Sequence, residues 1–163
     1  MKRILSTLCA AIVILGAAST TYAQTDTSTV TYSVAQVSLV NIAGDVSLTI
    51  NAGTAGSGLV SATANTTYAI TNNFTSSGVK ITGSLNSDMP ANTTLKLAVS
   101  APAASGTTGG VKTLSTTAQD LVTGIGAVIE SGLSMNFTLE ATVGAGVISS
   151  STKSLTLTLV NEA

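Results

Sequence analysis

Apolar and polar residues alternate along most of the chain, and this period of two is the feature that most constrains its fold. Strict alternation gives an extended strand one apolar face for a core and one polar face for water. The polar positions hold mainly serine and threonine, and the β-branch of threonine favours strand geometry. Five segments alternate most clearly: 30–34, 45–50, 94–100, 134–143 and 153–160.

The remaining strand-like runs are less regular, and short breaks rich in glycine, asparagine and proline separate them. These runs cover 37–42, 59–63, 67–74, 79–85 and 121–129. No long segment has helical periodicity, and the breaks are typical of turns between neighbouring strands. The pattern predicts an all-β protein, an antiparallel immunoglobulin-like β-sandwich of about eight or nine strands. The last two alternating segments, 134–143 and 153–160, are predicted to pair as a hairpin.

The first 23 residues have the three-part layout of a secretory signal peptide. Lys2 and Arg3 precede an apolar core at 4–18, and small residues at Thr21 and Ala23 indicate cleavage after Ala23. This core is shorter than the roughly 20 residues of a membrane-spanning helix, although an uncleaved N-terminal anchor is the alternative. Cleavage would also remove the single cysteine.

We therefore expect three parts: a signal peptide at 1–23, a flexible leader at 24–29 and one sandwich domain at 30–163. The layout predicts a bacterial protein that is secreted, periplasmic or exposed at the cell surface, with no membrane segment after cleavage. Leu8 precedes Cys9 where a lipoprotein signal needs a small residue, so no lipid anchor is expected.

The composition after residue 23 excludes several classes of chemistry. This part of the chain has four lysines, seven acidic residues, and no histidine, arginine, cysteine or tryptophan. Without histidine and cysteine, the usual nucleophile systems and zinc sites cannot form. A net charge of −3 with no arginine does not suit nucleic-acid binding. We expect no enzymatic activity, no cofactor and no metal site of these types.

The acidic residues are the remaining candidates for a site, and they are scattered singly through the chain. No D-x-D pattern or EF-hand spacing occurs among Asp45, Asp88, Asp120, Glu130 and Glu140. Asp45 and Asp88 fit turns, where aspartate binds nearby backbone donors. Convergence of two distant acids on calcium, or as a glycosidase pair, stays open at this stage.

The segment TLSTTAQDLVTGIG at 113–126 is the least repetitive part of the chain. Its apolar positions change parity between Ala118 and Leu121, which indicates a bulge or turn. We predict a corner between strands, with Asp120 binding backbone donors there. Gly124 and Gly126 would let the next strand twist or approach its neighbour closely.

The start of the sandwich domain allows two interpretations. The polar leader 24–29 is followed at once by the amphipathic run VTYSV at 30–34. A short amphipathic strand on a flexible leader is suited to β-augmentation, in which it joins the open sheet edge of another subunit. The alternative is that 30–34 forms the first strand of the chain's own sheet. The four aromatic residues of the mature chain are expected in the core: Tyr32, Tyr68, Phe74 and Phe137.

The export signal, the threonine-rich alternating strands, the terminal SLTLTLV and the block LSTTAQDLVTGIG together resemble small secreted bacterial sandwich subunits. Fimbrial subunits and spore-coat-U-like proteins are similar in style. The resemblance implies assembly or surface exposure, without catalysis. The chain differs from chaperone–usher pilins, which commonly carry a disulfide and an aromatic residue near the terminus.

We therefore expect a non-catalytic structural or surface protein, a fimbria-like or coat-like subunit whose partners are copies of itself or other surface subunits. Residues 30–34 are the candidate donor strand for this strand addition. The alternative is a monomeric adhesin or carbohydrate-binding module with a glycan ligand.

Overall fold

The computed structural model describes residues 24–75 and 78–162. By its internal contacts the chain divides into two units, and the second of them, Val34–Ala163, holds all the strands that the structure describes. The described strands of this unit pair in antiparallel fashion throughout, and none of its described residues is in an α-helix. The predicted all-β antiparallel sandwich is thus confirmed as a fold class. The predicted signal peptide at 1–23 lies outside the described residues.

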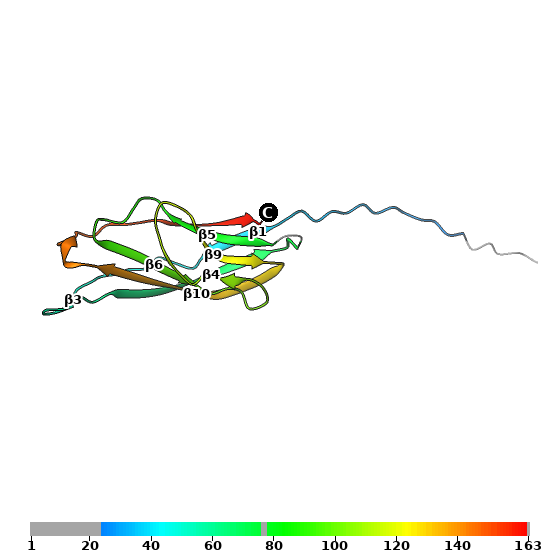
Figure 1. Ribbon diagram of the computed structural model, residues 1–163. Helices are drawn as coiled ribbons and strands as arrows, with labels where there is room; N and C mark the ends of the chain where they lie inside the picture. The colour runs from blue at the N-terminus through cyan, green and yellow to red at the C-terminus, as the bar shows by residue number, and fades with distance from the viewer. Residues whose placement is uncertain (1–23, 76–77, 163) are drawn as a thin grey trace, which may run out of the picture. The chain divides into compact units, whose positions relative to one another are not determined.

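Two sheets form the layers of the sandwich (Figure 1). The five-stranded sheet has the order β1 (Ser38–Ile42), β4 (Ala62–Asn72), β10 (Val128–Ala141), β6 (Thr93–Val99) and β8 (Val111–Thr113). The four-stranded sheet has the order β11 (Leu155–Asn161), β5 (Val79–Leu85), β9 (Gln119–Ile125) and β7 (Thr107–Thr108). A small hairpin of β2 (Gly53–Thr54) and β3 (Gly58–Leu59) and one 3-10 turn at Val143–Ala145 complete the elements.

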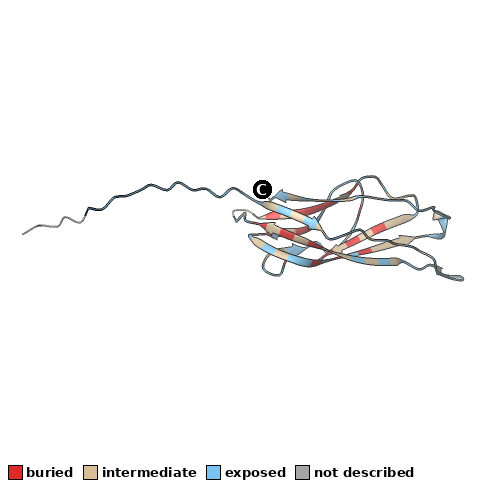
Figure 2. Ribbon diagram, turned by 180° about the vertical axis from the view of Figure 1, so that it is seen from behind, coloured by how far each residue is buried: buried red, intermediate tan, exposed pale blue. Residues whose placement is uncertain are grey.

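The core lies between the two sheets, and its buried strand residues belong to β4, β5, β6, β9 and β10 (Figure 2). In β6, for example, Leu95, Leu97 and Val99 are buried while the residues between them are half-buried. Each large side chain that is fully buried stabilises the fold by about 1.5–3 kcal/mol. The largest fully buried side chains are Tyr68, Ile70, Ile81, Leu97, Leu121, Ile125, Met135, Val79 and Val122.

The predicted hairpin between 134–143 and 153–160 is wrong. β10 lies in the five-stranded sheet, whereas β11 pairs with β5 at the edge of the other sheet. Residues 142–154 therefore carry the chain from one layer to the other. The alternation in both segments is real, but alternation defines which face of a strand is buried and does not define its partner.

The predicted corner within 113–126 is confirmed, but the role predicted for Asp120 is wrong. β8 ends at Thr113 in one sheet and β9 begins at Gln119 in the other. Asp120 lies within β9 and pairs with Lys80, whose Nζ is 3.0 Å from the carboxylate. Asp88 binds the corner instead, because its Oδ1 accepts hydrogen bonds from Thr116 N at 3.2 Å and Thr116 Oγ1 at 3.0 Å.

The change of parity between Ala118 and Leu121 falls at the start of β9, and β9 itself contains a bulge. Leu121 and Val122 are neighbours in sequence, yet both are fully buried, and the β5–β9 register shifts on both sides of Ile81. Gly124 adopts φ +67°, a conformation that favours glycine, and its N–H donates to the Glu162 carboxylate at 3.1 Å.

Tyr68 is the main polar group of the core. Its ring is 1% exposed, and its hydroxyl donates a hydrogen bond of 2.6 Å to the carbonyl oxygen of Ser100. Burial, together with the smaller effect of the negative charge of Glu130, raises the pKa of Tyr68 from 10.0 to about 12. The bond ties β4 to the residue that follows β6.

Because the pKa of Tyr68 is raised in the folded state, the free energy of unfolding should fall at alkaline pH. The contribution of Tyr68 is complete below the unfolded-state pKa near 10.0 and is lost as the pH rises through about 12. A shift of this size corresponds to about 3 kcal/mol of folding free energy. Denaturant unfolding between pH 9 and 12 should show this loss, and Tyr68→Phe should lower neutral-pH stability by about 1 kcal/mol while flattening the alkaline decline. An equally steep decline in Tyr68→Phe would contradict the assignment.

The two aspartates near the corner should differ in their effect on stability. Asp88→Ala removes two hydrogen bonds that hold the turn, and we expect a loss of about 1 kcal/mol or more. Asp120→Ala breaks one partly exposed ion pair, which is worth less than about 1 kcal/mol. Thermal denaturation of both variants measures the difference. A larger loss for Asp120→Ala would show that the ion pair, and not the Asp88 contact, supports this region.

Candidate functional site

The amphipathic run at 30–34 has no strand partner in the structure. Residues 24–37 belong to no strand, and β1 begins only at Ser38. The interpretation of 30–34 as the first strand of the chain's own sheet is therefore wrong. Val30, Tyr32 and Val34 are 78%, 88% and 83% exposed. Three large apolar side chains on one face of an unpaired segment are a candidate interaction site.

The point where this segment joins the sandwich is fixed by Asn73, which follows β4. Its side-chain Oδ1 accepts a hydrogen bond from Val37 N at 2.7 Å, and its Nδ2 donates to the carbonyl oxygen of Ala35 at 2.9 Å. Its main-chain N–H donates to the carbonyl oxygen of Val37 at 3.1 Å. Residues 35–37 are thus held to the end of β4. We call residues 24–34 the arm and Asn73 its anchor.

A groove of about 950 Å³ lies in the sandwich unit. Its floor is apolar and belongs to strands of both sheets, with Leu85, Leu95, Phe137, Leu139 and Leu155 among the lining residues. Two segments that are distant in the sequence form its walls: residues 45–50 form the first wall and residues 148–154 the second. Asp45 and Lys153 are the charged residues among those that line it.

The first wall is a strand-like segment whose backbone is unpaired. Beyond β1, the last main-chain bond to β4 joins Ala43 N to the carbonyl oxygen of Thr67 at 2.8 Å. Within the described chain, residues 45–50 make no further main-chain hydrogen bond. Their apolar side chains still alternate inward, and Val46 and Leu48 pack against the core. The strand predicted at 45–50 is therefore extended but has no ladder.

The second wall has the same property. No main-chain hydrogen bond among the described residues involves 147–152, where Val147 is fully exposed and Ile148 is 43% exposed. Pairing resumes at Ser154, whose N–H donates to Asn86 Oδ1 at 3.0 Å and whose carbonyl accepts from Asn86 N at 3.0 Å. Unpaired backbone at both walls of an apolar groove resembles two open sheet edges.

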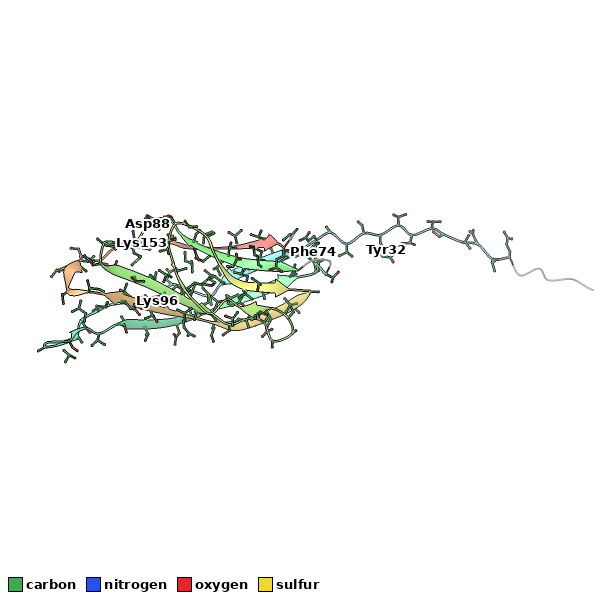
Figure 3. The ribbon with its side chains drawn as sticks, viewed as in Figure 1. Tyr32, Phe74, Asp88, Lys96 and Lys153 are labelled. Atoms are coloured by element: carbon green, nitrogen blue, oxygen red, sulfur yellow. The ribbon has the colours of Figure 1, made fainter. Side chains whose placement is uncertain are left out.

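Several charged side chains make contacts that hold strands and loops. Lys96 pairs with Glu140 at 2.7 Å across β6 and β10, and Glu130 accepts from Ala103 N at 2.9 Å. Lys153 donates to Ser87 Oγ at 2.8 Å beside Asp88, next to the Asn86–Ser154 clip (Figure 3). Across residues 24–75 and 78–162, no three acidic, histidine or cysteine residues gather in a group that suits a metal.

The aromatic residues divide between the core and the arm. Tyr68 and Phe137 are buried and Phe74 packs against the core, as predicted. The prediction that Tyr32 belongs to the core is wrong, because its ring is exposed on the arm (Figure 3). Among the described aromatic residues, Tyr32 is thus the one that is largely exposed.

Comparisons with protein-family models, with curated proteins and with solved structures find no match to this chain. In the part of the chain that the structure describes, no helix has the length and apolarity needed to cross a bilayer.

The anchor can be tested by local hydrogen exchange. Asn73→Ala removes both side-chain hydrogen bonds to residues 35–37, so we expect the Val37 amide to lose at least tenfold protection, since about 1.4 kcal/mol corresponds to a factor of ten. The amide of Ile70, inside β4, should keep its protection and serves as the control. Unchanged protection at Val37 would show that Asn73 does not hold the root of the arm.

Proposed function

We propose that this protein is an exported, non-catalytic structural subunit of a surface assembly, fimbria-like or coat-like, that joins other subunits by strand addition. The observation that supports this most directly is the arm. Val30, Tyr32 and Val34 form an exposed apolar stripe on a segment whose backbone has no strand partner. In strand addition, main-chain hydrogen bonds provide affinity and alternate side chains provide specificity.

The neutral character of the arm also supports this role. No charged residue occurs from Thr27 to Gly44, so burial of this segment in a partner carries no charge-desolvation cost. Thr31 and Ser33 alternate with the apolar residues, which gives the segment a polar face for water. Such a segment gains free energy when its apolar face is covered and its main chain is paired.

The export step of the proposal depends on the sequence of residues 1–23, whose basic start and apolar core favour secretion. A sandwich that contains no cysteine after this segment is stabilised by packing and strand pairing and needs no oxidising enzyme. Secretion, a periplasmic location or display at the cell surface are all compatible with this stability.

Substitutions confined to one face of the arm test the proposal. Residues 24–163 with Val30, Tyr32 and Val34 all changed to serine keep the arm's length but lose its apolar stripe. The matched control, Thr31→Ser with Ser33→Thr, alters the polar face alone. We expect size-exclusion chromatography and electron microscopy to show multimers of the native chain and of the control, and monomers of the triple variant.

Deletion of residues 24–34 should have the same effect as the triple substitution. Monomers in all four preparations over a wide concentration range would contradict self-assembly. A glycan-binding signal that depends on Tyr32 in such monomers would support the carbohydrate-binding alternative.

A further inference from the structure

The groove in the sandwich unit has the properties of an incomplete core. Buried side chains away from the groove, such as Ile70, Ile81 and Met135, are at most 2% exposed. Around the groove, Val46, Leu139 and Leu155 pack against the core but remain only partly buried. Leu85, Leu95 and Phe137 at the floor are already buried, so the apolar surface that stays accessible in the single chain belongs to partly buried residues such as Leu139 and Leu155. Its exposure has a free-energy cost proportional to its area.

We infer that this groove is an acceptor site for residues 30–34 of a second copy of the chain. This inference rests on the proposed function and names the site that strand addition would use. A strand laid between residues 45–50 and 147–152 would find unpaired main-chain groups on both sides. Its inward side chains would cover Leu139, Leu155 and the neighbouring apolar floor.

The arm matches this site in its apolar pattern and its lack of charge, and its run 30–34 has the length of an ordinary strand. Five extended residues span about 17 Å, the length of an ordinary strand. Val30, Tyr32 and Val34 project from one face toward an apolar floor, while Thr31 and Ser33 project to water. Since the arm carries no charge in this stretch, Asp45 and Lys153 at the groove neither attract nor repel it as a net charge.

The arm cannot fill the groove of its own chain, because its anchor is too far away. The anchor Asn73 follows the last residue of β4, whereas the groove extends from Ile42, which pairs with Tyr68, to Leu139, which pairs with Ala62. At about 3.3 Å per residue, these points lie about 17 and 36 Å from the anchor along β4. Val30 is five residues from Ala35 and reaches at most about 18 Å, so only the tip of a fully extended run 30–34 comes to the near rim.

Donor and acceptor therefore belong to different copies, and each copy still offers a free groove or a free arm after pairing. Such a contact is heterologous, and it produces open chains of subunits unless the rotation between copies closes a ring. Within the sandwich unit, β1 and the C-terminus lie at one end and the β3 hairpin lies at the other (Figure 1).

Cysteine crosslinking tests the site. The full-length chain, expressed with residues 1–23 for export, receives Ser33→Cys on the arm and one of Ser47→Cys, Thr49→Cys or Ser150→Cys at the exposed positions of the walls. Under mild oxidation we expect at least one pair to give a ladder of disulfide-linked multimers that a reductant removes. Mixing chains that each carry one cysteine of that pair should give dimers and no larger species.

Two controls define the background. Ser33→Cys with Ser134→Cys places the second thiol on the exposed face of β10, and the native chain reports any crosslink through Cys9. Multimers no more abundant than in these controls would overturn the inference, as would a crosslink within one chain. If arm-dependent multimers then persist in electron micrographs, the acceptor assignment alone is wrong. If no multimers form at all, the proposed function is overturned as well.

Discussion

The antiparallel ladder between β4 and β10 is the interaction on which the rest of the structure depends. β4 also binds β1, and β10 also binds β6, so this pair holds the five-stranded sheet together. Tyr68 on β4 closes the core with its hydroxyl on Ser100. β4 also sets the distance between the arm and the groove. The anchor Asn73 follows the C-terminal end of β4, whereas the groove lies toward its N-terminal end.

The sequence predicts the fold class well because alternation is a direct record of burial. In each alternating strand that forms, the predicted apolar side is the less exposed one: it is fully buried at Met135 and Phe137 of β10 and half-buried along β11. What alternation does not record is pairing, which depends on residues distant in the chain. Segments 30–34 and 45–50 alternate as regularly as the true strands, yet neither forms a ladder. For the same reason the predicted hairpin of β10 with β11 is wrong. The corner before β9 was predictable from parity, but the acid that binds it, Asp88, lies about 30 residues away.

Of the two parts of the candidate site, the arm could be predicted from the sequence and the groove could not. The arm is evident because an amphipathic pentapeptide follows a polar leader. The groove was not, since its walls come from segments about 100 residues apart, and the serine-rich sequence of 147–152 gives no periodic signal. Asn73 likewise looks like one of many asparagines in the sequence, and only its place after β4 makes it an anchor. Both features arise from tertiary contacts, which a local pattern does not encode.

The central claim is that residues 30–34 are unpaired in the single chain and paired in the assembly. Amide hydrogen exchange of the assembled protein, compared with the monomeric form, measures this directly. We predict that the amides of 30–34 become strongly protected from exchange on assembly, together with amides in 45–50 or 147–152. The protection of the amides in β4 should change little. Exchange of 30–34 at the rate of a free peptide in the assembled protein would contradict it.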